Sequence, residues 1–200
     1  MSRRLVLASQ SPARLQLLRA AGLDPEVVVS GVDESAVQAP RVAELVALLA
    51  SAKAVAVAKA QTDALVVGAD SVLEFRGQPL GKPVDAADAR LRWARMGGRS
   101  GVLHTGQAVL DVRDGTVVRR DVGVSSTVVH FASPAPAELE AYLATGEPLQ
   151  VAGAFTLDGL GGQFVRRIEG DPSAVIGLSM PLLRTQLAKL DVTLTDLWRR

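Results

Sequence analysis

The apolar run Leu-Val-Val-Gly-Ala at residues 65–69 constrains the fold more than any other segment. Because neither face of this run offers a polar position, it is typical of a strand that is buried on both sides. A second apolar run occupies residues 5–8, and segments with helical spacing of apolar residues alternate with such runs. Helices must then cover both faces of a sheet, so the sequence predicts an α/β protein.

Start and stop signals place the helices between the strands. Ser11 and Pro12 are a cap and a first-turn residue, and Gly22 follows the last turn of the same segment. The pair Asp114-Gly115 between two strand-like segments predicts a hairpin, so we expect a mixed sheet. The expected helices are 12–21, 42–60, 85–96, 136–144 and 181–190, and further strands are expected at 26–30 and 163–168.

Length and charge limit the classes of function. A chain of 200 residues with 48% hydrophobic content can bury one substantial core, and no linker or repeat divides it, so we expect one domain over residues 1–200. A net charge of +1 and 4% aromatic residues argue against nucleic acid as a partner. Any phosphate binding must therefore be local.

Residue types that commonly bind metals or form covalent intermediates are scarce. The chain has no cysteine and two histidines, His104 and His130, which form no zinc-binding motif. A metal would therefore be a hard cation on oxygen ligands. The run at 5–8 is too short for a signal peptide, and no segment approaches the ~20 apolar residues of a membrane helix. We expect a cytoplasmic protein without a membrane partner.

The first strand-to-helix turn, residues 9–14, is a candidate anion site. Unpaired N–H groups at a helix N-terminus favour anions, and Arg14 stands where a capping box would place an acidic or amide side chain. Ser9 and Ser11 add hydroxyl groups. Alternatively, Ser11 only caps the helix and Arg14 is a surface residue; this turn alone does not decide between the two interpretations.

Carboxylates form the second candidate group. Asp33 and Glu34 lie in an expected loop, where acids are usually solvated. Asp70 directly follows the apolar run, so we expect it at a strand end, where an acid is costly unless it caps, pairs or binds something. Hydrolysis of a phosphoanhydride needs a divalent cation, a base or metal that readies water, and cations around the phosphates.

Several lysine and glycine motifs fail stricter tests. Lys82 lies in a glycine-containing turn that lacks the spacing and hydroxyl residue of a P-loop, so an exposed turn lysine is the simpler interpretation. Lys53 is expected on the solvent side of its helix. Residues 159–162 lack the dinucleotide-binding spacing, and residues 177–181 end in Pro where a nucleophile elbow needs Gly.

Taken in order, a series of short motifs resembles the Maf family of nucleoside triphosphate pyrophosphatases. Each motif is weak alone, but their ordered combination is specific and extends from Leu5 to about Leu190. The motifs lie at residues 7–14, 32–34, 68–71, 81–83, 105–106, 152–155 and 175–178. The resemblance implies an elongated mixed sheet flanked by helices, as in inosine triphosphate pyrophosphatases, with two lobes around a central cleft.

The resemblance also implies cleavage between the α- and β-phosphates, a Mg²⁺ or Mn²⁺ cofactor and a homodimer. Asp70 matches the family's proposed catalytic base, and Glu34 matches an acid that helps hold metal or water. Carried over in the same way, the wall around the triphosphate consists of Ser9, Ser11, Arg14, Lys53 and Lys82, of which Lys82 is also a catalytic candidate.

Three positions that resemble the family's specificity sites are Ala13, Ser71 and Asp158. The branch similar to thymidine and uridine triphosphatases has Arg, Thr and Gln there, and the 7-methylguanosine branch has Trp, Gln and Glu. This chain matches neither, although Asp158 keeps a carboxylate, which favours a purine or a broad specificity. The alternative is a nucleotide-binding regulator of cell division without turnover. A phosphotransferase would need an acceptor site, for which the sequence offers no candidate.

Overall fold

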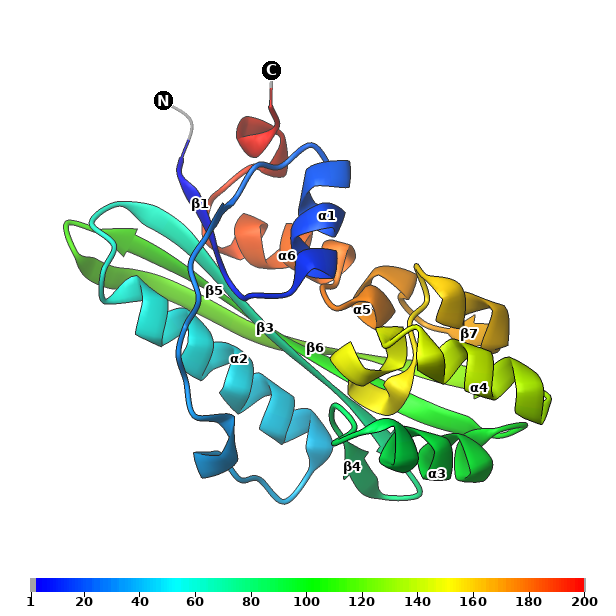
Figure 1. Ribbon diagram of the computed structural model, residues 1–200. Helices are drawn as coiled ribbons and strands as arrows, with labels where there is room; N and C mark the ends of the chain where they lie inside the picture. Colours follow the sequence, from blue (N-terminus) through cyan, green and yellow to red (C-terminus); the bar gives the residue numbers. More distant parts are fainter. Residues whose placement is uncertain (1–2, 200) are drawn as a thin grey trace.

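The computed structural model describes residues 3–199, and within them a seven-stranded sheet has the order β2-β1-β3-β5-β6-β7, with β4 paired to β3 (Figure 1). β1 pairs in parallel with β2 and β3, and the other pairs are antiparallel. The mixed α/β prediction is therefore confirmed. The strands are β1 (Leu5–Ala8), β2 (Glu26–Val27), β3 (Ala64–Phe75), β4 (Gln78–Leu80), β5 (Ser100–Arg113), β6 (Thr116–Phe131) and β7 (Val165–Glu169).

The predicted hairpin and helices are present with small shifts of their ends. Asp114 and Gly115 join β5 to β6, and both have the positive φ that a two-residue hairpin turn requires, 48° and 74°. α5 was not predicted. The helices are α1 (Pro12–Ala20), α2 (Val42–Ala58), α3 (Ala86–Met96), α4 (Pro136–Ala144), α5 (Pro172–Ile176) and α6 (Met180–Lys189).

Two strand predictions need correction. The strand expected at 26–30 is only Glu26–Val27, because its neighbour β1 ends at Ala8 and offers nothing further to pair with. Asp70 is not at a strand end: β3 continues through it to Phe75, since β5 pairs along the whole length of β3.

The other edge of β3 leaves Asp70 without a strand partner on that side. On that edge, β1 pairs with β3 as far as Ala8↔Gly68, and β4 pairs with it from Leu73↔Leu80 onward. Asp70 and Ser71 lie between these two partners. A long, firmly paired strand thus carries both residues past a gap in the sheet edge.

Two glycines let α2 approach the sheet closely. A Cβ added at Gly68 would lie 2.3 Å from the carbonyl oxygen of Ala50, and one at Gly106 would lie 2.1 Å from that of Val46. Only residues without a side chain fit at these points. α2 crosses the sheet directly over β3 and β5 (Figure 1). Its close approach brings a lysine of α2 within reach of β3.

The core divides along β3. Residues 64–69 pack in clusters that include α1, α6 and α2, whereas Leu73 and Phe75 belong to a cluster around Trp93. Trp93 makes an edge-to-face contact with Phe131, with 5.7 Å between the ring centroids. Figure 1 shows α1 and α6 towards one end of the sheet and α3 and α4 towards the other. Asp70 and Ser71 therefore lie between the lobe that contains α1 and α6 and the lobe that contains α3 and α4.

No helix within residues 3–199 is long and apolar enough to cross a membrane.

Candidate active site

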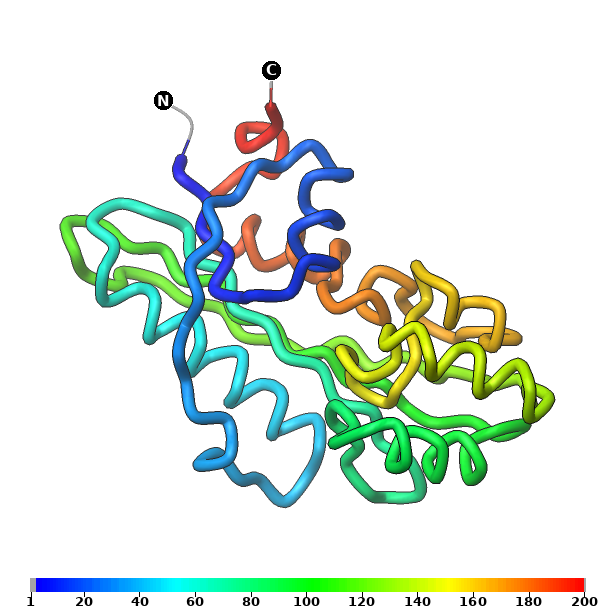
Figure 2. The backbone as a smooth tube through the Cα atoms, viewed as in Figure 1, coloured from blue at the N-terminus to red at the C-terminus, as the bar shows by residue number. Residues whose placement is uncertain are grey.

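Lys53 links two carboxylates beside the gap in the β3 edge. Its Nζ lies 2.6 Å from Asp70 Oδ1 and 2.6 Å from Glu34 Oε1. The expectation of a solvent-facing Lys53 was wrong: the residue is 8% exposed, because the close packing of α2 turns this face towards β3. Glu34 begins the 3-10 helix η1 (Glu34–Ala36), which the chain reaches after β2 (Figure 2).

The environment of Asp70 changes its proton affinity. The residue is 7% exposed, and burial raises the pKa of its carboxyl above the ordinary value, because the ionised form loses water. Lys53 and, more weakly, Arg14 oppose this shift. A carboxylate with a raised pKa accepts a proton more readily than a solvated one, which suits a general base.

Arg14 is held in place by neutral acceptors. Its Nε donates to the Gly177 carbonyl at 2.8 Å, Nη1 donates to Ser9 Oγ at 3.1 Å, and Nη2 donates to Ser71 Oγ at 3.3 Å. These bonds use three of the five guanidinium N–H groups, so two remain. At 9% exposure, Arg14 is not the surface residue of the alternative interpretation. Burial lowers its pKa, and nearby Asp70 and Glu34 oppose that shift.

The first turn of α1 has the expected geometry of a capped helix N-terminus. Ser11 Oγ accepts a hydrogen bond from Arg14 N at 3.5 Å, which confirms Ser11 as the N-cap. Ser9 Oγ accepts from Ser11 N at 3.2 Å as well as from the guanidinium. The loop and the arginine are therefore fastened to each other.

The two clusters flank one strand. Successive residues of a β-strand point to opposite faces, so Asp70 faces α2 while Ser71 faces away from it. Lys53 and Glu34 gather on the first face, and Arg14 reaches the second. The candidate site wraps around the unpaired stretch of the β3 edge, with a cation on each side.

Three other predicted site residues stand apart from this group. Lys82 is exposed, and its carbonyl accepts from Arg92 Nη2 at 3.4 Å. Ala13 is half-buried in the first turn of α1. Asp158 is exposed in a loop before the 3-10 helix η4 (Leu160–Phe164). Within residues 3–199, no hydrogen bond or ion pair joins these side chains to Asp70 or Arg14.

The loop that carries Asp158 is nevertheless well anchored. Glu147 Oε1 accepts from Thr156 Oγ1 at 2.5 Å and from Gly161 N at 3.0 Å, and its Oε2 accepts from Leu160 N at 3.1 Å. Partial burial raises the pKa of Glu147, but these hydrogen bonds together outweigh it and hold the pKa below its ordinary value. No local pattern in the sequence singles out Glu147.

Two carboxylates could take part in holding a metal. Glu34 and Asp70 supply hard oxygen ligands, and Mg²⁺ is commonly bound through one or two carboxylates together with substrate phosphates. In the described part of the chain, no three His, Cys, Asp or Glu side chains converge. The donor set fits a metal that the substrate helps to bind.

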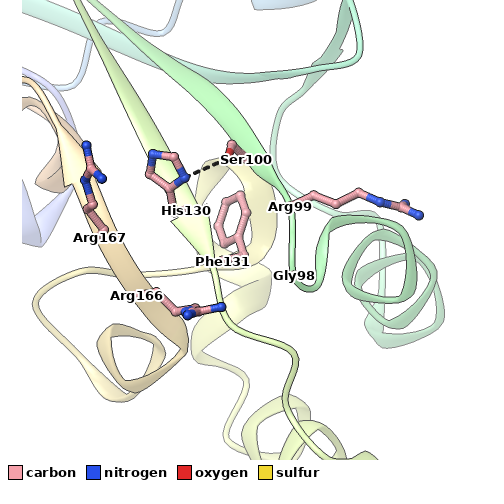
Figure 3. Close-up of a pocket in the computed structure, with 7 residues that line it drawn as sticks. All are labelled: Gly98, Arg99, Ser100, His130, Phe131, Arg166 and Arg167. Carbon is pink, nitrogen blue, oxygen red and sulfur yellow. Dashed lines mark hydrogen bonds between the residues drawn. The ribbon is translucent and has the colours of Figure 1, made fainter.

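The two histidines lie in separate cross-strand rows. His130 contacts Ser100 Oγ through Nδ1 at 2.8 Å and Glu169 Oε1 through Nε2 at 2.9 Å, beside a hollow of about 400 Å³. Figure 3 shows Ser100 and His130 directed towards each other and Arg99 extending away from them. His104 makes similar contacts with Ser126 and Glu74. Neither residue contacts Asp70.

Comparison with known proteins decides the family. The family model described as Maf-like protein matches residues 4–190. The chain belongs to the Maf-like family.

This Maf-like protein has relatives that it matches over nearly its whole length and that carry the name nucleoside triphosphate pyrophosphatase. The one from Salinispora tropica is 58% identical, with 98% of this chain and 88% of the relative covered. The one from Streptomyces coelicolor is 58% identical, with 98% and 95% covered. The one from Nocardia farcinica is 57% identical, with 100% and 98% covered.

Sequence reasoning gave no role to two groups that hold Arg14 in this Maf-like protein. Gly177 supplies the carbonyl acceptor for Nε, and Thr105 lies behind Ser71, with 2.9 Å between the two hydroxyl oxygens. The available signal for the first was a glycine after an apolar segment: Gly177 has φ +133°, and a Cβ there would lie 3.2 Å from Arg14 Nε. Both residues lie in motifs of the family resemblance, at 105–106 and 175–178, but nothing in those motifs indicated a link to Arg14.

Proposed function

We infer that this Maf-like protein is a nucleoside triphosphate pyrophosphatase, which hydrolyses the bond between the α- and β-phosphates to give a nucleoside monophosphate and pyrophosphate. One observation carries the proposal: a buried arginine with two spare N–H groups lies across a strand edge from a buried carboxylate with a raised pKa. The relatives' shared name supports the same activity.

In the proposed reaction, each side of the strand has its own task. Arg14, Ser9 and the N-terminus of α1 bind phosphate oxygens, because a guanidinium fork and backbone N–H groups suit such anions. Asp70 takes a proton from the attacking water, and the water oxygen forms a new bond to the α-phosphorus. The bond between the α-phosphorus and the oxygen that bridges to the β-phosphate breaks, and pyrophosphate leaves with that oxygen. Lys53 keeps the Asp70 carboxylate oriented.

The proposed cofactor is Mg²⁺ or Mn²⁺, held by Glu34 and Asp70 with substrate oxygens. Such an ion, when bound, neutralises charge that develops on the phosphates. Glu34 itself is more than half exposed, with a side-chain exposure of 57%, so it can turn from Lys53 towards a metal while Lys53 keeps its contact with Asp70.

Lys82 and the three specificity positions complete the proposal. The carbonyl of Gly81 accepts from Gly153 N at 3.1 Å and from Arg92 Nη1 at 2.6 Å, which fixes the backbone next to Lys82 while its side chain stays free to reach a phosphate. We assign base selection to Ala13, Ser71 and Asp158. A carboxylate at Asp158 can accept hydrogen bonds from a guanine edge, which favours purines.

We also propose that the enzyme is a cytoplasmic homodimer. Light scattering at micromolar concentration would give twice the 20.9 kDa chain mass. A monomer mass would contradict the dimer but leave the chemistry unaffected.

The deciding experiment incubates the protein with a panel of nucleoside triphosphates and Mg²⁺ or Mn²⁺ and identifies the products by mass. We expect monophosphate and pyrophosphate in equal amounts. Diphosphate with inorganic phosphate would contradict the proposed bond, and tight binding without any product would favour the division regulator. Asp63→Asn, an exposed change just before β3, is the matched control for Asp70→Asn.

A further inference from the structure

Behind Ser71 lies a short chain of hydroxyl groups that ends on the main chain. Thr105, in β5, is fully buried, and its Oγ1 donates to the Ala174 carbonyl at 2.8 Å. The same Oγ1 lies 2.9 Å from Ser71 Oγ, and Ser71 Oγ accepts from Arg14 Nη2 at 3.3 Å. Four groups from four segments of the chain are thus connected in a row.

The chemistry of these groups fixes the direction of every bond in the row. A carbonyl can only accept, and a hydroxyl has one hydrogen to give. The Thr105 hydrogen is therefore committed to Ala174, so Ser71 must donate its own hydrogen to Thr105. A guanidinium can only donate, which agrees with the last bond, from Arg14 to Ser71.

We propose that Thr105 is a positioning residue: by taking the hydrogen of Ser71, it leaves the Ser71 hydroxyl only an acceptor towards Arg14 and the substrate, and thereby holds Arg14 in the orientation that receives the nucleotide. The proposal rests on the proposed function, because it concerns the same site. It also makes Ser71 selective: a substrate group that meets this hydroxyl must donate, as an amine, ring N–H or ribose hydroxyl does, and a carbonyl is disfavoured there.

Loss of the Thr105 hydroxyl removes its hydrogen bonds to Ala174 and Ser71. In Thr105→Val, the Ser71 hydrogen is free to turn towards Arg14 or the substrate, so the guanidinium loses a fixed acceptor. We expect affinity for an α,β-methylene nucleoside triphosphate, measured by calorimetry, to fall roughly 3- to 10-fold. Thr105→Ser keeps the hydroxyl and should restore affinity to within about twofold of wild type.

Thr127→Val is a closely matched control. Thr127 is also fully buried in the sheet, and its Oγ1 donates to the Asp171 carbonyl beside α5 at 3.2 Å, but it does not contact Ser71 or Arg14. Its Oγ1 also accepts from Asp171 N at 3.0 Å, and Asp171 caps α5, so we expect Thr127→Val to lower thermal stability in the manner of Thr105→Val but to lower nucleotide affinity clearly less. Equal affinity losses in the two valine variants would overturn the proposal, because the effect would then be general destabilisation.

A double-mutant cycle tests whether Thr105 affects nucleotide binding only through Ser71. If Thr105 acts only through Ser71, the pair Thr105→Val with Ser71→Ala binds no worse than Ser71→Ala alone. Fully additive losses would overturn the proposal. Thr105→Ala, which also lacks the hydroxyl, takes the place of Thr105→Val if that variant does not fold.

Failure of this proposal can be distinguished from failure of the proposed function. The methylene analogue cannot be cleaved, so calorimetry measures how tightly the site binds it, whether or not the protein has any turnover. Absence of pyrophosphate from natural nucleotides with wild-type protein would contradict the activity. Unchanged analogue affinity in Thr105→Val would contradict the role of Thr105 alone.

Discussion

The two sides of the β3 edge each carry a buried cation, but the partners of these cations differ. Lys53 contacts two carboxylates, Asp70 and Glu34, whereas the three hydrogen bonds of Arg14 all go to neutral oxygens. The positive charge of Lys53 is therefore balanced by carboxylates of the protein itself. Arg14 keeps its charge for an outside anion, since a carbonyl or hydroxyl orients a guanidinium without cancelling it.

This difference separates two tasks that a phosphate-cleaving site must perform. A paired lysine can orient a base and adjust its pKa, but it attracts a polyanion weakly. An arginine with neutral partners attracts the polyanion, and two of its N–H groups are free for phosphate oxygens. We expect changes on the Lys53 side to alter turnover and changes on the Arg14 side to alter binding.

The largest effect should come from Asp70→Asn, which keeps the shape of the side chain but cannot accept a proton. We expect kcat to fall roughly 10²- to 10⁴-fold, as for loss of a general base. Steady-state pyrophosphate release measures it, with circular dichroism to show that the variant folds. Wild-type turnover in this variant would contradict the role of Asp70.

Next in size is Arg14→Lys, which keeps the charge but loses the fork and the fixed bonds to Gly177 and Ser71. Because each charge-assisted bond contributes about 1.5–3 kcal/mol, we expect KM to rise roughly 10- to 100-fold, with a smaller change in kcat. Arg19→Lys is the control on the same helix, since Arg19 is exposed. A change confined to kcat would contradict the assignment of binding to Arg14.

Lys53→Met tests how the base is adjusted. Burial already raises the pKa of Asp70, and Lys53 is the main group that opposes it, so its removal raises that pKa further. The acid limb of the kcat/KM profile should therefore move to higher pH. Lys59→Met, at the exposed end of α2, should leave the limb in place. An unchanged limb in Lys53→Met would contradict the coupling.

The same raised pKa has a consequence for stability. A carboxyl whose pKa is higher in the folded than in the unfolded state favours folding when protonated, and this contribution is lost as the pH rises through the folded value. Asp70 therefore opposes folding once it is ionised. In the Lys53→Met variant this loss of stability should extend to higher pH, which denaturant titrations at several pH values would detect.

The smallest effect should come from Glu34→Gln. Its side chain is mostly exposed, so we expect unchanged stability and a severalfold higher Mg²⁺ concentration at half-maximal activity. Titration of activity against Mg²⁺ measures this, and Glu44→Gln at the start of α2 is the control. Identical metal dependence in wild type and Glu34→Gln would remove Glu34 from the metal site.

Local signals in the sequence predicted most of the fold. Apolar runs, the Ser11 cap and the Asp114-Gly115 turn each act over a few residues, so they can be read without the tertiary structure. The extent of β3 could not be predicted, because pairing with a strand some forty residues later in the chain carries it past Asp70. The burial of Lys53 likewise depends on Gly68 and Gly106, which decide how closely α2 approaches.

The candidate site was predicted unevenly for the same reason. The loop at 9–14 and Asp70 carry chemistry in their own residue types, so a search for charges and caps finds them. The carbonyl of Gly177 and the hydroxyl of Thr105 hold Arg14 from positions 163 and 91 residues away; both residues lie in motifs of the resemblance, but their local sequence does not show this link. Roles that depend on distant contacts need the structure.

The division between the two sides is tested most directly by measuring binding and turnover of Asp70→Asn and Arg14→Lys side by side. Calorimetry with an α,β-methylene nucleoside triphosphate measures binding, and pyrophosphate release from the natural nucleotide in the same buffer measures turnover. We predict that Asp70→Asn binds within about threefold of wild type while turnover is lost, and that Arg14→Lys shows the reverse pattern. Equal losses of binding and turnover in both variants would contradict it.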